Sequence, residues 1–346
     1  MKKFIKRITV FILVLICFFA AKKFFTPYYL GDKTIYAKYT GFSERPEKFN
    51  TVIFGSSRLY RQINSHLLDS LMNERNFSTY NFAAPGTFNP ATYYLYENFI
   101  DSRHSKTVDR AFLELQTLSH YTGSNCTTTT ASYWNNAKYL LFSLNYINHS
   151  TYSADIKKEL YSCYLKSYLF GFYDFSNFLN LFRPIDMDEV GVNGFLSMEE
   201  AMNIKDENAS LIERWQDFRS DTSEISERIE AANQAVTTAM NYEVNTYHQQ
   251  YLTSLIEKSR NKGIELIYII PPRLTESQYN ELVPLANSLP QNHVIELYNY
   301  SDYSEFYRAA YSFDIGHLNT EGANIFTKFL AEKIKDLNTS VKNSSK

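Results

Sequence analysis

Two adjacent serines follow a short apolar run near the start of the chain, in the stretch VIFGSSRLYR at 52–61. The run predicts a strand, Gly55 permits a tight turn, and a helical pattern follows the serines. A hydroxyl at such a turn lies beside the unpaired N–H groups of the first helical turn, which also favour an oxyanion. Ser57 could therefore be a nucleophile. The alternative is that Ser56 and Ser57 are only the small residues that a turn requires.

A serine nucleophile needs a base, and the base needs an acid that orients it. Two of the seven histidines have an aspartate three residues earlier, a spacing at which the carboxylate can reach the ring from one turn of chain. These pairs are Asp101–His104 and Asp314–His317. Either pair has the chemistry of an acid and a base, so their positions in the fold must separate them.

The elements that must position these residues alternate along the chain. Short apolar runs predict five strands, at 51–54, 78–83, 110–116, 264–270 and 294–297. Helical patterns follow, at 59–73, 90–102, 276–288 and 320–336. This alternation predicts an α/β fold with a doubly wound, mainly parallel five-stranded sheet flanked by helices.

Ligands of such sheets bind outside the carboxyl ends of the strands, and this rule separates the two pairs. His104 comes just before the third strand, so it is expected at the amino edge of the sheet. His317 follows the fifth strand, so it is expected at the carboxyl edge together with Ser57. We therefore take Asp314 and His317 as the candidate acid and base, and we interpret His104 as a solvated surface residue.

The alternation stops after the third strand. Residues 117–225 are rich in Tyr, Asn, Ser and Phe, which predicts a large, mainly helical insertion with helices near 138–147 and 196–203. One long helix with an apolar stripe is expected at 226–261, ended by Gly263. The predicted division of the chain is 1–25 cytoplasmic start and anchor, 26–50 polar connector, 51–116 and 226–337 core, 117–225 insertion, and 338–346 polar tail.

The amino terminus has the pattern of an export signal. MKKFIKR is positively charged, residues 8–21 are uncharged and mostly apolar, and two lysines follow. A span needs about 20 residues, although flanking side chains can extend a short run. A cleaved signal peptide is the alternative, but no clear A-x-A site follows, so we favour a single-pass anchor that contacts the bilayer through residues 8–25. The positive-inside rule then places the bulk of the chain outside the inner or cytoplasmic membrane.

Composition narrows the classes of partner. The net charge of −2 and the pI near 6.4 argue against a nucleic-acid-binding protein. The 28 Tyr and 26 Phe residues suit a protein that presents aromatic faces to sugars, and they equally suit a compositionally biased genome. Cys126 and Cys163 lie in the exported part, where a disulfide or two buried thiols would fit. No Cys or His cluster suggests a metal, and no cofactor is implied.

Three stretches together resemble blocks of the SGNH/GDSL superfamily of esterases and acyltransferases. They are FGSSR at 54–58, NFAAPG at 81–86 and DIGHLNTEGA at 314–323. The form of the first block and the amino-terminal anchor look most like the exported branch of the superfamily. That branch includes alginate acetylation proteins and the D-alanyl transfer protein of teichoic acids, which work beside membrane-bound O-acyltransferases.

The resemblance implies a role for each matching residue. Ser57 would be the nucleophile, His317 the base and Asp314 the acid, and the N–H groups of Ser57 and Gly86 would form the oxyanion hole. The implied activity is transfer or hydrolysis of O-acyl groups on a cell-envelope or secreted polysaccharide, without a cofactor or metal. A membrane-bound O-acyltransferase is the implied partner.

The family pattern is incomplete in this chain. The G-x-N-D motif, whose asparagine is a third oxyanion donor, is missing, and Gln116 in LELQTLSH has the chemistry and the approximate place to substitute for it. Arg58 and Arg61 could bind an anionic sugar, or they are solvated arginines of a first helical turn. The missing motif and the insertion leave open a non-catalytic alternative, a subunit with this fold that binds a glycan or a membrane-bound O-acyltransferase.

Overall fold

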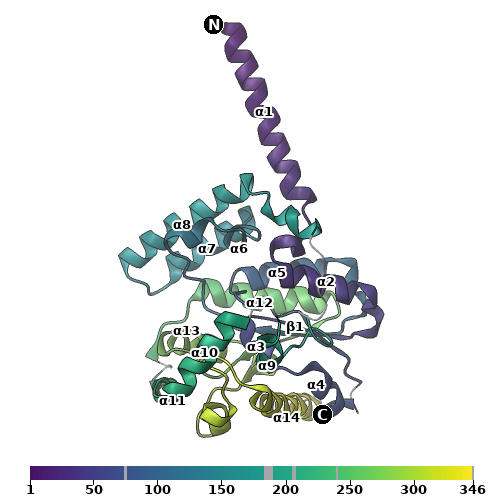
Figure 1. Ribbon diagram of the computed structural model, residues 1–346, viewed down its shortest axis with the longest axis vertical. Coiled ribbons are helices and arrows are strands. Elements are labelled where there is room, and N and C mark those ends of the chain that lie inside the picture. The colour runs from purple at the N-terminus through teal and green to yellow at the C-terminus, as the bar shows by residue number, and fades with distance from the viewer. Residues whose placement is uncertain (74–75, 183–189, 205–207, 239–240, 345–346) are drawn as a thin grey trace.

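The computed structural model describes residues 1–73, 76–182, 190–204, 208–238 and 241–344 (Figure 1). Five strands form one parallel sheet in the order β2-β1-β3-β4-β5. They are β1 (Thr51–Phe54), β2 (Thr79–Asn81), β3 (Arg110–Glu114), β4 (Glu265–Ile270) and β5 (Val294–Glu296). In this order the chain reverses its direction across the sheet between β1 and β3, which makes a crevice at their carboxyl ends.

The strands are buried on both faces, as their continuous apolar sequences predict. All of β1 is buried, and Thr51 of β1 lies opposite Thr79 of β2 and Arg110 of β3. Helices α3 (Ser57–Gln62), α4 (Ser65–Leu71) and α14 (Thr320–Ser344) pack together on one face, and α5 (Ala91–Asp101) and α12 (Thr246–Asn261) cover the other (Figure 1). The prediction of an α/β fold with a parallel five-stranded sheet flanked by helices is confirmed.

Two predicted helices are each broken into two. The helix expected at 59–73 ends at Gln62, because the Asn64 side chain accepts a hydrogen bond from Leu67 N and starts α4. The helix expected at 226–261 is α11 (Glu224–Thr238) followed by α12, which Asn245 caps through His248 N. Residues 239–240 lie outside the described residues. An asparagine side chain at these positions accepts a hydrogen bond from a backbone N–H and starts a new helix, although the apolar periodicity of the sequence continues through it.

The segment 26–50 is more than a polar connector. Asp32 caps α2 (Lys33–Glu44) by accepting hydrogen bonds from Thr34 N and Ile35 N. The apolar face of α2 is buried, and the Phe42 ring lies 4.9 Å from that of Phe82, which follows β2. The segment is therefore part of the core. The predicted polar tail also differs, since α14 continues to Ser344.

The described part of the segment between β3 and α11 is mainly helical. Its longer helices are α7 (Ala137–His149), α8 (Ala154–Tyr173) and α10 (Asn208–Ser220). Its shorter ones are α6 (Thr129–Ser132), α9 (Met198–Met202) and the 3₁₀ helices η5 (Gly123–Thr127) and η6 (Ser176–Phe182). A disulfide joins Cys126 of η5 to Cys163 of α8. Residues 183–189 and 205–207 of the predicted insertion lie outside the described residues.

The amino terminus forms one long helix, α1 (Lys2–Phe25), which projects away from the rest of the molecule (Figure 1). The helix over residues 2–22 is long and apolar enough to cross a membrane, and most of its apolar side chains are exposed. An apolar surface of this size is unstable in water, so α1 is consistent with membrane association as a transmembrane or signal-anchor segment.

Candidate active site

Ser57 is the first residue of α3 and stands directly above the carboxyl end of β1. The preceding Ser56 is the N-cap, and its Oγ accepts a hydrogen bond from Arg58 N at 3.2 Å. A first helical residue has a backbone N–H without a partner inside the helix. Ser57 therefore presents a hydroxyl and an N–H donor at the same edge of the sheet.

A buried carboxylate at the end of the neighbouring strand fixes the turn before Ser57. Glu114 of β3 accepts hydrogen bonds from Ser56 N at 2.5 Å and from Ser56 Oγ at 3.0 Å. A Cβ on Gly55 would lie 2.6 Å from Glu114 Oε2, so glycine is needed here for this close approach. Burial raises the pKa of Glu114, and the charge of Arg58 opposes that shift.

Ser57, His317 and Asp314 form one continuous relay. His317 Nε2 lies 2.8 Å from Ser57 Oγ, and His317 Nδ1 lies 2.9 Å from Asp314 Oδ1. Asp314 Oδ1 also accepts hydrogen bonds from the backbone N–H groups of Gly316 and His317, both at 2.8 Å. The backbone of the loop thus orients the Asp314 carboxylate, and this carboxylate in turn orients the His317 ring.

The electrostatics suit a neutral imidazole beside an ionised carboxylate. Burial by itself would raise the pKa of Asp314, but hydrogen bonding and the charges of His317 and Arg214 outweigh it and lower this pKa to about 2. Burial lowers the pKa of His317, and the charges of Arg214 and Arg58 add to that effect while Asp314 opposes it. Near neutral pH, His317 can therefore accept a proton from a hydroxyl.

Two arginines that the sequence did not single out hold the Asp314–His317 loop. Arg273, buried just after β4, donates to the carbonyl oxygen of Asp314 at 3.0 Å and to Ser312 Oγ at 2.5 Å. Arg214 of α10 forms an ion pair with Asp314 Oδ2, and its Nη2 lies 3.0 Å from His317 Nδ1. Arg273 follows a predicted strand at the carboxyl edge, which was a usable signal. Arg214 lies in a segment whose sequence pattern gives none.

A pocket of about 560 Å³ opens in front of the relay. Gly86 lies on its wall with φ of 67°, a left-handed conformation that favours glycine in the Pro85-Gly86 turn. Helices α9 and α10 cover the pocket on the opposite side. Its lining residues are Ser57, Arg61, Pro85, Gly86, Met198, Ala209, Ser210, Leu211, Arg214 and His317. The structure thus brings together Ser57, Gly86, Asp314 and His317.

Three other predicted site residues have different surroundings. The Gln116 amide donates to the Thr87 carbonyl at 3.1 Å and accepts from Thr92 Oγ1 at 2.7 Å, and it does not line this pocket. Gln116 therefore supports the loop after β2 and is not placed as a third oxyanion donor. Arg61 lines the pocket but is anchored to the Leu196 carbonyl at 3.1 Å. Arg58 faces a neighbouring cavity.

The other histidine–aspartate pair is separated in the structure. The His104 ring packs against the Tyr39 ring at 5.6 Å, and Asp101 forms ion pairs with Lys258 and Lys262. His104 belongs to η4 (Arg103–Thr107), just before β3, so it lies at the amino edge of the sheet as predicted. Within the described residues, no group of three or more His, Cys, Asp or Glu side chains could hold a metal ion.

Comparison of the chain with protein-family models, curated proteins and solved structures finds no match. The function must therefore be inferred from the residues of the site, the pocket in front of them and the position of the site in the fold.

Proposed function

We propose that this chain is a serine-dependent O-acyltransferase or carboxylic ester hydrolase with Ser57 as its nucleophile. The observation that carries the proposal is the relay from Ser57 Oγ through His317 to Asp314, with contacts of 2.8 and 2.9 Å at the mouth of an open pocket. A nucleophile, a base and an orienting acid in hydrogen-bond contact are what acyl transfer through serine needs.

In the first half-reaction Ser57 Oγ attacks the carbonyl carbon of the acyl donor while its proton passes to His317 Nε2. Asp314 keeps the Nδ1 proton in place and stabilises the imidazolium. The backbone N–H groups of Ser57 and Gly86 are the proposed donors to the oxyanion of the tetrahedral intermediate. Collapse of the intermediate breaks the bond to the leaving group, which takes the proton from His317 and leaves an acyl ester on Ser57.

In the second half-reaction a hydroxyl group attacks the acyl ester of Ser57. His317 takes the proton of the attacking hydroxyl and returns it to Ser57 Oγ as the ester bond breaks. If the hydroxyl belongs to a glycan, the protein is a transferase; if it belongs to water, the protein is an esterase. Neither half-reaction requires a metal or a cofactor.

The proposed substrate is an O-acyl group of a cell-envelope or secreted polysaccharide. Two observations support it: the resemblance of the three sequence blocks to the exported branch of the SGNH/GDSL superfamily, and the apolar helix α1. In this proposal α1 is a single-pass anchor, the site faces the extracytoplasmic side, and a membrane-bound O-acyltransferase supplies the acyl group.

One observation favours the second candidate, a non-catalytic subunit that binds a glycan or a membrane-bound O-acyltransferase. The Gln116 amide is bonded to Thr87 and Thr92, so it does not supply a third side-chain donor to the oxyanion. Loss of one such donor lowers the rate by about 10²–10³. We prefer the enzyme hypothesis because a binding subunit would not need the complete relay of Ser57, His317 and Asp314.

A fluorophosphonate probe distinguishes the two candidates, since it labels only an activated serine. We expect the full chain to be labelled on Ser57, the Ser57→Ala variant to remain unlabelled, and the Ser56→Ala control to be labelled more slowly. Absence of labelling in a folded wild-type chain would leave the binding subunit as the function.

A further inference from the structure

A second cavity lies beside the relay at the same edge of the sheet. Its volume is about 570 Å³. Its walls come from the segments that follow four strands: Arg58 after β1, Phe88 after β2, residues 117–121 after β3 and residues 275–281 after β4. This cavity, the strand-end cleft, therefore occupies the crevice where ligands of such sheets bind.

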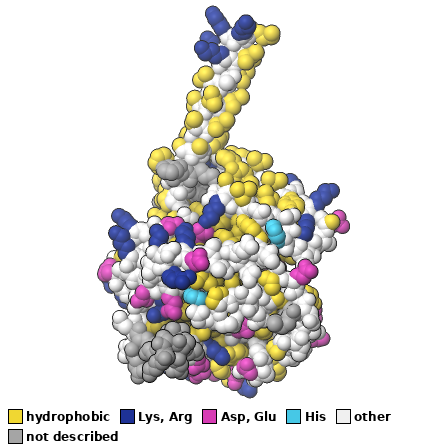
Figure 2. Space-filling view, turned by 180° about the vertical axis from the view of Figure 1, so that it is seen from behind, with side chains coloured by type: hydrophobic (Ala, Val, Ile, Leu, Met, Phe, Trp, Pro, Cys, Tyr) yellow, Lys and Arg dark blue, Asp and Glu magenta, His cyan; other side chains and the backbone are white. Residues whose placement is uncertain are grey.

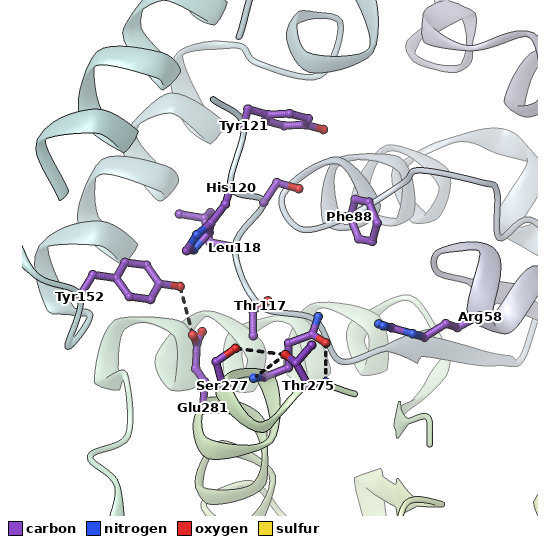
Figure 3. A pocket seen from close by; sticks show the side chains of 12 residues that line it. Arg58, Phe88, Thr117, Leu118, His120, Tyr121, Tyr152, Thr275, Ser277 and Glu281 are labelled. Atoms are coloured by element: carbon purple, nitrogen blue, oxygen red, sulfur yellow. Dashed lines mark hydrogen bonds between the residues drawn. The ribbon is translucent and has the colours of Figure 1, made fainter. Parts of the chain in front are cut away.

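Arg58 brings a guanidinium group to the strand-end cleft. Its side chain reaches into the cavity from the α3 side (Figure 3). In the part of the chain that the structure describes, its guanidinium makes no hydrogen bond, and the nearby Glu114 acts on it through its charge alone. A partly buried guanidinium needs a partner for its planar set of donors, and a carboxylate or phosphate is the partner that fits.

The rest of the cleft combines polar groups with aromatic rings. Tyr152 and Glu281 lie at the end opposite Arg58, and the tyrosine hydroxyl donates to Glu281 Oε2 at 3.0 Å (Figure 3). Glu281 Oε1 is buried and has no protein partner among the described residues. Thr117 and Ser277 add hydroxyls to the wall, and Phe88 adds an aromatic face. Polar groups around an aromatic ring match a sugar ring with its hydroxyls.

We propose that the strand-end cleft binds the acyl acceptor, a glycan with a carboxylate or phosphate group that pairs with Arg58. The identification as an acceptor rests on the proposed function; the identification as an anionic glycan does not. Arg58 directly follows Ser57, which lines the other pocket, so the cleft and that pocket lie on either side of the turn that carries the nucleophile. The acyl donor then binds in the separate pocket in front of His317, so that donor and acceptor approach Ser57 from different sides.

Binding can be measured by calorimetry on the full chain in nanodiscs, without turnover. The probes are a galacturonate trisaccharide, glucose 6-phosphate and the uncharged maltotriose. We expect at least one charged probe to bind about tenfold or more tightly than maltotriose, and the Arg58→Gln variant to lose this preference. Arg45→Gln, an equal change of charge at the exposed residue that follows α2, is the matched control and should keep it.

The outcomes separate this proposal from the proposed function. Ser57→Ala should bind the charged probe as the wild type does. If the wild-type chain is not labelled by the fluorophosphonate but binds the charged probe, the proposed enzyme activity is wrong and the proposed glycan site stands. Arg58→Lys retains the charge without the planar fork and should keep part of the preference, which guards against a folding defect in Arg58→Gln. Equal affinity for charged and uncharged probes, or a preference that survives Arg58→Gln, would overturn the proposal.

Helices α8 and η6 form an exposed apolar surface. Leu165, Leu169 and Tyr173 recur every four residues on one side of α8 and are 45%, 60% and 59% exposed. Leu179 and Phe182 of η6 continue the surface and are 55% and 83% exposed. Scattered exposed apolar residues are ordinary, but a contiguous group of this kind marks a surface that is covered.

Helix α1 ends beside this surface, at the junction of α8 and η6. The rings of Phe18 and Phe19 of α1 lie 5.9 and 6.2 Å from the ring of Phe175, and Lys22 Nζ donates to the Gly171 carbonyl at 3.3 Å. Hydrophobic side chains gather around the foot of α1 (Figure 2). A bilayer that holds α1 therefore reaches the level of α8.

We infer that α8 and η6 lie on the bilayer surface, with their exposed apolar side chains among the lipid headgroups and upper acyl chains. Leu169→Trp in the full chain, reconstituted in vesicles of phosphatidylcholine and phosphatidylglycerol, should add fluorescence that lipids brominated near the headgroup quench. Val236→Trp, at a 48% exposed position of α11, is the control and should add unquenched fluorescence. An unquenched Leu169→Trp, or the same residue buried by a second protein, would overturn the inference.

Discussion

The spacing Asp-x-x-His occurs twice in the chain. In one copy the two side chains are hydrogen-bonded to each other, and in the other copy they contact different residues. Asp314 holds His317 at 2.9 Å beside Ser57. Asp101 ends α5 and turns to Lys258 at 2.6 Å, while His104 packs on Tyr39. The same spacing in the sequence is therefore not enough to form an Asp–His hydrogen bond.

The difference lies in the backbone between aspartate and histidine. In the 314–317 loop, backbone N–H groups point at Asp314 Oδ1 and hold the carboxylate toward the ring. At 101–104 the chain leaves one helix for another, and Ser102 caps the second by accepting from His104 N at 3.2 Å. The carboxylate of Asp101 instead forms ion pairs with Lys258 of α12 and with Lys262, which follows that helix. The Asp–His hydrogen bond therefore forms where the backbone N–H groups of the turn hold the aspartate carboxylate.

The largest effect should come from removing the relay on the Ser57 side. We expect Ser57→Ala and His317→Ala each to lower kcat for a short aryl ester by roughly 10⁶, because members of such a relay act as a unit. The double variant should be little worse than either single one. His104→Ala should keep wild-type kcat; a loss in His104→Ala similar to that in His317→Ala would break the comparison.

Replacement of the acid tests the two aspartates directly. Asp314→Asn removes the acceptor that fixes the His317 tautomer and should lower kcat by roughly 10⁴. Asp101→Asn should leave kcat unchanged. Steady-state hydrolysis of the same ester, with circular dichroism as the check on folding, measures both, and a small effect of Asp314→Asn would show that the loop alone orients His317.

The pH profile should sharpen the comparison further. His317 must be neutral to act as a base, and its pKa is lowered, so kcat/KM should rise with pH along a limb whose midpoint lies below 6.5. The charge of Arg214 is one cause of that lowering, so Arg214→Gln should move the limb to higher pH and lower kcat by about tenfold, the equivalent of about 1.4 kcal/mol. A limb that stays in place, or that moves to lower pH, would contradict this role of Arg214.

The smallest effect should be on stability at the Asp101 site. This aspartate is 49% exposed in its ion pairs with Lys258 and Lys262, and exposed pairs stabilise weakly. Asp101→Asn should therefore lower the free energy of unfolding by less than about 1 kcal/mol. Urea denaturation of the full chain in nanodiscs measures it, and a larger loss would mean that the pair at 101–104 has a structural role of its own.

Much of the fold was predictable because its signals are local. The five apolar runs, the turn at Gly55 and the order of the elements follow from hydrophobic pattern and turn chemistry, and together they place Ser57 and His317 at one edge. The helix breaks at Asn64 and Asn245 were missed because an asparagine inside a periodic pattern fits either a helix or a cap, and tertiary packing decides between them.

The sequence by itself determined that a serine ends a buried strand and that an Asp-x-x-His loop follows the last one. Only the tertiary structure decided that Arg214 and Arg273 hold that loop, that Gln116 supports the turn after β2, and that Arg58 faces a separate cleft. The physical reason is distance along the chain. Periodicity and turn propensity report interactions between near neighbours, whereas Arg214 and Asp314 are 100 residues apart and meet only because the helices after β3 fold back over the sheet.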